Sequence, residues 1–153
     1  MRVLGIDYGR KRIGLALSDP SGMLARPWKT LEVSGAGSQV AALAREVDLL
    51  ASELDGLEVI VIGLPRRLSG EPNEQTAAVQ ALAAQLATLT SIPIAFQDER
   101  LTSREAESLL SRREKDWRKR KPLLDAAAAA VILQDYLDTS RSPAAIPEPE
   151  AEP

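Results

Sequence analysis

The sequence contains neither cysteine nor histidine among its 153 residues. The lack of cysteine excludes disulfide bonds, thiolate nucleophiles and cysteine-ligated zinc. The lack of histidine excludes serine–histidine hydrolysis, histidine general bases and histidine-ligated zinc. Any catalysis must therefore rest on carboxylates, on a hard cation that prefers oxygen ligands, such as Mg²⁺ or Mn²⁺, and on Lys11 as a candidate basic group.

Long apolar runs are also missing. No run approaches the length of a membrane-spanning helix, and the N-terminus lacks the apolar segment of a secretory signal. We therefore expect a cytoplasmic protein. The length of the chain favours one domain with a substantial hydrophobic core.

An overall excess of positive charge is missing too, because the net charge is −3. The distribution is uneven, however. Residues 112–121, here called the basic run, hold seven Lys or Arg against Glu114 and Asp116, a local charge of +5. A local field of this sign steers a polyanion, and Trp117 within the run can stack on an unpaired base. The basic run thus predicts a nucleic-acid contact; the alternatives are a solvated charged surface and a Trp117 that anchors the connector to the core.

Hydrophobic periodicity and turn residues predict five strands and four helices. The strands are expected over 2–8, 12–18, 25–33, 58–63 and 92–97, and the helices over 38–53, 74–89, 103–112 and 123–138, the last opened by Pro122. This order predicts an α/β fold with a mixed five-stranded sheet, in which a three-stranded antiparallel meander is joined by two parallel strands. We expect one domain over residues 1–138 and a disordered tail rich in Pro and Glu over 139–153.

Three acids stand at the ends of apolar segments or within one: Asp7, Glu99 and Asp125. A carboxylate beside a core costs several kcal/mol unless it is paired or binds a metal. Carboxyl ends of parallel strands meet at one edge of a sheet, and the first turn of the last helix can reach the same edge. The three acids therefore favour a shared divalent-cation site, with Asp98 as the alternate to Glu99.

Simpler interpretations of these acids exist. Asp7 can close a hairpin by accepting a nearby amide. Asp98 and Glu99 can be surface charges, with Asp98 paired to Arg100, and Asp125 suits the first turn of a helix because of the helix dipole.

Four motifs resemble those of the YqgF/RuvX family, a branch of the ribonuclease H-like nucleases. They are residues 5–19 (GIDYGRKRIGLALSD), 63–65 with Gly70, 98–103 (DERLTS), and Asp125 with 132–137 (ILQDYL). The resemblance implies a ribonuclease H-like fold and a nuclease that binds divalent metal through carboxylates. It also implies maturation of the 5′ end of pre-16S ribosomal RNA or, alternatively, resolution of Holliday junctions.

By the same resemblance, Asp7 is the metal ligand of the first strand, Glu99 the second acid and Asp125 the acid of the last helix. Two departures are visible: Ala126 stands where many members have Ser, and the connector before Asp125 is richer in basic residues and poorer in Gly. The first concerns helix capping and the second concerns substrate choice.

The mechanism expected from these residues is in-line hydrolysis of a phosphodiester. Two Mg²⁺ or Mn²⁺ ions, about 3.5–4 Å apart in such sites, flank the scissile phosphate, and Asp7 bridges them. Cationic and aromatic side chains are expected to hold the nucleic acid: Lys11, Arg12, Arg66, Arg67, Arg100, Trp117, Arg118, Lys119, Arg120 and Lys121.

Two other functions stay open at this point. The Gly5–Gly9 segment also resembles the phosphate loop of actin/hexokinase-type ATPases and sugar kinases, although those enzymes need two such domains. The chain is alternatively a nucleic-acid-binding module without catalysis, in which the acids are structural. The sequence does not decide between RNA and branched DNA, between endo- and exonuclease action, or between a monomer and a homodimer.

Overall fold

The computed structural model describes residues 1–9, 11–32, 38–65, 69, 71–98 and 117–141; for 117–123, 140 and 141 it describes the backbone alone. The elements are β1 (Arg2–Tyr8), β2 (Arg12–Ser18), β3 (Ala25–Glu32), α1 (Ser38–Ser52), β4 (Leu57–Leu64), α2 (Glu74–Ala87), β5 (Ile94–Asp98) and α4 (Trp117–Arg141). The helix predicted over 103–112 lies outside the described residues.

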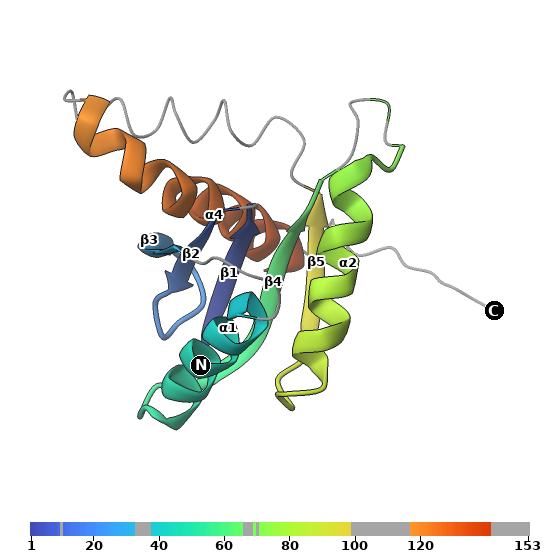
Figure 1. The fold of residues 1–153 in the computed structure, drawn as a ribbon. Helices are drawn as coiled ribbons and strands as arrows, with labels where there is room; N and C mark the ends of the chain where they lie inside the picture. Colours follow the sequence, from blue (N-terminus) through green and yellow to red (C-terminus); the bar gives the residue numbers. More distant parts are fainter. Residues whose placement is uncertain (10, 33–37, 66–68, 70, 99–116, 142–153) are drawn as a thin grey trace.

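The strands form one mixed sheet in the order β3-β2-β1-β4-β5 (Figure 1). β1, β2 and β3 pair antiparallel in a meander, and β4 and β5 continue the sheet parallel to β1. The predicted α/β class and the predicted mixed sheet are both confirmed. The central place of β1 matters for the site, because a residue at its carboxyl end has strands on both sides.

Helices cover both faces of the sheet (Figure 1). Helices α1 and α2 pack on one face, here called the α1/α2 face, whose core includes Leu4 and Ile6 of β1 and Ile60 and Ile62 of β4. Helix α4 contacts all five strands from the other side, here called the α4 face. The period of two along a strand explains the division, since Val3 of β1 packs with α4 instead.

The alanine run of α4 lets this helix lie close to the sheet. Ala129 and Ala130 pack in one core cluster with residues of β1, β2 and β4, so the helix presents methyl groups to the sheet where larger side chains would hold it away. Ile132, Leu133 and Leu137 then anchor its C-terminal half against the sheet.

Helix α4 is longer than the sequence predicts. It begins at Trp117 instead of residue 123, and it ends at Arg141, three residues beyond the predicted helix end at 138. The prediction that Pro122 opens this helix is wrong, because Pro122 is its sixth residue. Arg and Lys are good helix formers and extend the helix ahead of Pro122, although the missing N–H of Pro122 removes the helical bond to the carbonyl of residue 118. Residues 142–153, the rest of the predicted tail, lie outside the described residues.

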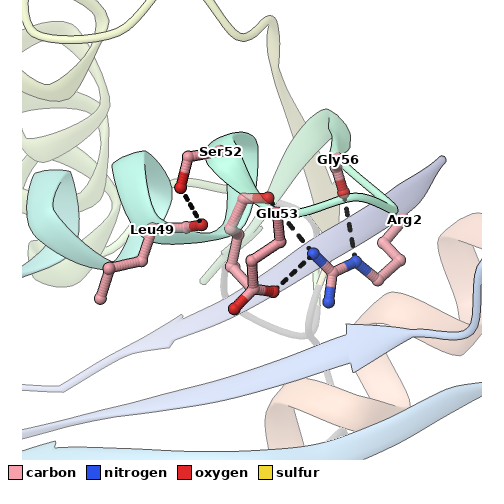
Figure 2. Close-up of polar contacts among 6 residues, drawn as sticks. Arg2, Leu49, Ser52, Glu53 and Gly56 are labelled. Carbon is pink, nitrogen blue, oxygen red and sulfur yellow. Dashed lines mark hydrogen bonds and ion pairs between the residues drawn. The ribbon is translucent and has the colours of Figure 1, made fainter.

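The amino end of β1 is fixed by Arg2 (Figure 2). Its guanidinium donates to the carbonyls of Leu50 and Gly56 and forms an ion pair with Glu53 at 2.9 Å. These bonds tie β1 to the turn between α1 and β4. The end of the sheet opposite Asp7 is therefore held by several bonds at once.

None of the helices in the described ranges combines the length and the apolar character that crossing a bilayer requires.

Candidate functional site

Asp7 lies near the carboxyl end of the central strand β1 and pairs in register with Gly14 of β2. Gly5, two residues earlier, faces α4, because a Cβ built on it lies 2.8 Å from Cβ of Leu133. Since side chains alternate along a strand, Asp7 shares the α4 face with Gly5. Asp7 thus stands on the face that α4 covers, as the prediction of a shared site requires.

Gly14 brings Asp125 to the same place. A Cβ built on Gly14 lies 1.9 Å from the backbone oxygen of Asp125, so only a glycine lets the helix come this close to β2. Because Gly14 is the register partner of Asp7, the first described turns of α4 pass beside the carboxyl end of β1. Asp7 and Asp125, which are distant in sequence, therefore converge on one edge and one face of the sheet.

Asp125 forms an ion pair with Arg12, the first residue of β2. The Nε atom of Arg12 donates to Oδ2 of Asp125 at 2.9 Å. The two side chains are 40% and 28% exposed, so the pair lies at the surface and a ligand can reach it. A predicted metal ligand is thus bonded directly to a predicted phosphate-binding residue.

Lys11 lies beside this pair in the turn between β1 and β2. The backbone N–H of Gly9 donates to the carbonyl of Arg12 at 2.9 Å and closes the turn. Lys11 is exposed at its tip, where a polyanion can reach it.

Asp98 does not fit the alternate role that the sequence leaves to it. It pairs in register with Leu64, which belongs to the core under α1 and α2. Paired residues of neighbouring strands share a face, so Asp98 lies on the face opposite Asp7. Strand β4 also separates β1 from β5, which places their backbones about 10 Å apart.

The other predicted site residues are placed only in part. Glu99, Arg66, Arg67 and Arg100 lie outside the described residues. The backbone of Trp117, Arg118, Lys119, Arg120 and Lys121 forms the N-terminal turns of α4.

In the described part of the chain no group of three His, Cys, Asp or Glu side chains lies close enough to hold a metal ion. The convergence of all three acids stays a prediction, with two of the three on a common edge.

Two contributors to the site were not identified from the sequence. Gly14 stands in the first motif, but nothing local shows that a helix more than 100 residues away packs on it. Gln134 fixes α4 from its other end: its Oε1 accepts the N–H of Ala25 at 2.9 Å, and its Nε2 donates to the carbonyl of Met23 at 3.0 Å. A polar residue within the apolar 131–137 segment is the one signal that points to Gln134.

Comparison with known proteins identifies the family. Residues 1–139 match the family model described as "RuvX: Holliday junction resolvase". The chain belongs to the RuvX family. The predicted resemblance is confirmed over the whole length on which it was based. The Gly5–Gly9 segment left two enzyme classes open, a nuclease and an ATPase or sugar kinase. Membership in a nuclease family decides for the first, a hydrolase that acts on phosphodiester bonds.

Relatives within this family are similar over nearly their full length. A protein of Clavibacter michiganensis subsp. michiganensis is 41% identical over 139 residues, which cover 91% of this chain and 84% of the relative. A protein of Dictyoglomus thermophilum is 41% identical over 140 residues, 92% of this chain and 97% of the relative. Both carry the name "Putative pre-16S rRNA nuclease".

Solved structures support the fold. The RuvC of Thermus thermophilus, solved with a Holliday junction substrate, aligns with a TM-score of 0.52 at 18% identity, over 92% of this chain and 95% of that one. The Holliday junction resolvase of fowlpox virus aligns with a TM-score of 0.58 at 11% identity, over 92% and 99%. The RuvX chain therefore has the ribonuclease H-like fold that the resemblance implies.

Proposed function

We propose that this RuvX protein is a divalent-metal-dependent nuclease that hydrolyses phosphodiester bonds in the processing of the 5′ end of pre-16S ribosomal RNA. One observation carries the proposal. The close approach of α4 at Gly14 brings Asp125 beside the strand end that holds Asp7. Two carboxylates from opposite ends of the chain thereby share one edge of the sheet. The names of the relatives that are 41% identical supply the substrate.

The donors on this edge suit Mg²⁺ or Mn²⁺. Asp7 and Asp125 offer hard carboxylate oxygens, and the chain has no His or Cys that would favour a softer metal. When bound between such carboxylates, a divalent ion activates water and stabilises the leaving oxygen of a phosphodiester. The protein side chains hold and orient the site.

Glu99 is the third acid in this proposal. Asp98 ends β5 on the α1/α2 face, which is opposite the face of Asp7, so we do not take Asp98 as the third acid. The motif that includes Glu99 supports the same choice. Glu99 completes a set of three acids, the number that the sequence alone led us to expect.

The cations around the site suit a nucleic-acid backbone. Arg12 and Lys11 lie at the turn beside Asp7 and are accessible from solvent. Residues 118–121 precede Asp125 by four to seven positions on the same helix, so their backbone lies about 6–11 Å from it along the axis at 1.5 Å per residue. Residues 118–121 of the basic run are thus adjacent to Asp125, where they can bind the phosphates that flank the scissile one.

A second substrate is favoured by the description of the family itself, which names a Holliday junction resolvase. RNA and branched DNA offer the same phosphodiester to the acids. The third possibility, a binding module without catalysis, does not explain why Asp7 and Asp125 lie on one edge of the sheet.

A cytoplasmic location follows from the proposed role in ribosomal RNA processing.

A side-by-side cleavage assay tests the proposal. The full chain is offered single-stranded RNA that carries the 5′ leader of 16S ribosomal RNA, single-stranded DNA and a four-way DNA junction, each with Mg²⁺, Mn²⁺ or EDTA. We expect cleavage of the RNA that EDTA abolishes. Cleavage of the junction alone would replace the proposed substrate, and an absence of metal-dependent cleavage on all three would contradict the enzyme.

Substitution of Asp7 separates catalysis from binding. Asp7→Asn keeps the shape of the side chain but removes its negative charge, so we expect cleavage to fall on the order of 10³-fold, about 4 kcal/mol of barrier. Binding of the RNA in Ca²⁺ or EDTA should stay within a factor of two or three. Undiminished cleavage by Asp7→Asn would show that this residue is not a ligand.

A further inference from the structure

The ion pair between Arg12 and Asp125 uses only one atom of each side chain. Nε of Arg12 donates to Oδ2 of Asp125 at 2.9 Å. Within the described residues, the two side chains make no other hydrogen bond or ion pair. An Arg–carboxylate pair is frequently bidentate, and this one is not. Oδ1 of Asp125 and both Nη groups of Arg12 are therefore left for other partners.

The backbone on both sides of the pair is already fixed. Arg12 is held in β2, where it pairs in register with Glu32 of β3. The backbone of Asp125 rests on Gly14, two residues along β2 from Arg12. The freedom that remains to Asp125 is rotation of its carboxylate, and the bond from Arg12 restricts that rotation.

We propose that Arg12 is a positioning residue for the metal site. It holds Oδ2 of Asp125 so that Oδ1 is presented to the cation, and its two Nη groups stay available for a phosphate oxygen of the nucleic acid. The inference rests on the proposed function, because it takes Asp125 as a ligand. It adds that Arg12 orients the carboxylate of Asp125 and also contacts the substrate. Metal binding and substrate binding are then coupled through a single guanidinium.

Metal affinity distinguishes this role from a simple counter-charge. A cationic side chain repels a divalent ion, so on charge alone the loss of Arg12 strengthens metal binding. A partner that orients a metal ligand acts in the opposite direction, and its loss typically weakens metal binding 10–100-fold. The two roles thus predict changes of opposite sign.

The experiment measures Mn²⁺ binding to the full chain by calorimetry, without nucleic acid. We expect Arg12→Gln to weaken Mn²⁺ binding about 10-fold. Arg26→Gln is the matched control, because it removes the same charge from an exposed residue of β3 that pairs with Leu17, at the other end of the strands from Asp7. Its Mn²⁺ affinity should be equal to that of the wild type or slightly higher. Equal or tighter Mn²⁺ binding by Arg12→Gln would overturn the positioning role.

A second variant guards against a change in folding. Arg12→Lys keeps the charge and the aliphatic stem but loses the Nε donor of the guanidinium. We expect it to bind Mn²⁺ more weakly than the wild type, with an unchanged circular dichroism spectrum. If Arg12→Lys binds Mn²⁺ with the affinity of the wild type, Arg12 acts only through its charge, and the inference is contradicted.

The failure of the inference and that of the proposed function are distinguishable. If the wild type binds no Mn²⁺ and cuts nothing, the proposed nuclease is wrong. If the wild type binds Mn²⁺ and cuts RNA, and Asp125→Ala loses both, then unweakened binding by the Arg12 variants contradicts the positioning role alone.

Discussion

The missing side chain of Gly14 sets the distance between α4 and β2. The position of its absent Cβ lies 1.9 Å from the backbone oxygen of Asp125 and 2.8 Å from the backbone nitrogen of Ala126. Backbone atoms cannot move out of the way as the end of a side chain can, so any larger residue must displace the helix. The displaced residue would be Asp125 itself, which makes Gly14 a determinant of the site.

Gly14→Ala tests this dependence. We expect a loss of about 3 kcal/mol in the free energy of unfolding, because the methyl group overpacks a closed interface. Cleavage should fall further than the stability loss explains, since Asp125 moves away from Asp7. Urea denaturation and the cleavage assay measure the two effects separately.

Gly22→Ala is the control for Gly14→Ala. Gly22 has a φ of +74° and no atom within 4 Å of its absent Cβ, so the methyl group of an alanine there meets no neighbour. The substitution destabilises the fold only through the left-handed backbone conformation, by about 1–2 kcal/mol. It lies in the β2–β3 turn, at the other end of the strands. We expect lower stability with full cleavage activity below the melting temperature. Unchanged activity in Gly14→Ala as well would show that the packing at Gly14 does not position Asp125.

The turn between β2 and β3 depends on the ionised side chain of Asp19. The hydroxyl of Ser21 donates to Oδ2 at 2.6 Å, and the backbone N–H groups of Leu24 and Met23 donate to Oδ1 at 3.1 and 2.9 Å. The Ser21 bond and the two backbone bonds lower the pKa of Asp19 from 3.8 to about 2. All three donors favour the charged form of the carboxylate.

This shift predicts the behaviour of the protein in acid. The pKa of Asp19 is lower in the folded state than in the unfolded chain. The ionised side chain therefore stabilises the fold, and this contribution to the free energy of unfolding is fully present above about pH 4. The contribution is lost as the pH falls from 3.8 towards about 2. We expect the melting temperature of Asp19→Asn to decline less between pH 4 and 2 than that of the wild type. Parallel declines would show that Asp19 is not ionised preferentially in the fold.

Helix α4 joins three separate tasks in one element. Its alanines and its apolar C-terminal half cover the sheet, Asp125 faces the site, and its N-terminal turns carry the end of the basic run. A rigid helix holds these parts at fixed spacing, because each residue adds 1.5 Å along the axis. Residues 118–121 of the basic run and Asp125 are therefore held at a fixed spacing, although their chemistry differs.

Charge reversal in these turns tests their contact with the substrate. Arg118, Lys119 and Arg120 changed together to Glu should weaken binding of the nucleic acid and lower the slope of log affinity against log salt by about 2–3. Arg45→Glu on α1 is the control, because Arg45 is an exposed residue of a helix on the opposite face of the sheet. An unchanged salt slope in the triple variant would show that the N-terminal turns of α4 face away from the substrate.

In the molecule as a whole, the first strand and the last described helix meet at the site. Asp7 comes from the first strand and Asp125 from the last helix, and the sheet and α4 must both be folded before the two acids lie together. A cation bound there binds the folded state and not the unfolded one. Metal binding therefore adds to the stability of the entire fold.

Metal addition and removal test this linkage. At a free Mn²⁺ concentration 100 times the dissociation constant, the folded state gains about 2.7 kcal/mol, which for a chain of this size raises the melting temperature by about 5–10 °C. Excess EDTA should reverse the rise, and Asp7→Asn should abolish it. Identical melting temperatures in Mn²⁺ and EDTA would contradict a cation site between these acids.

The local elements and the family were predictable from the sequence. β1 and β2 have the predicted bounds, and the buried residues of α1 recur at helical spacing: Val40, Leu43, Val47 and Leu50. These features follow from alternation, helical spacing and turn residues, which involve neighbours within a few positions. The motifs that carry the family resemblance are likewise local.

The arrangement of the site was decided by tertiary structure alone. The bond between Arg12 and Asp125 joins residues 113 positions apart, and no periodicity in either segment contains it. The face on which Asp98 lies follows from its register with β4, and α4 begins six residues earlier than predicted, with Pro122 inside it. Residue types and their order determined which groups this protein can use. Their convergence depended on the close packing of a helix against one glycine, a contact that exists only after the chain has folded.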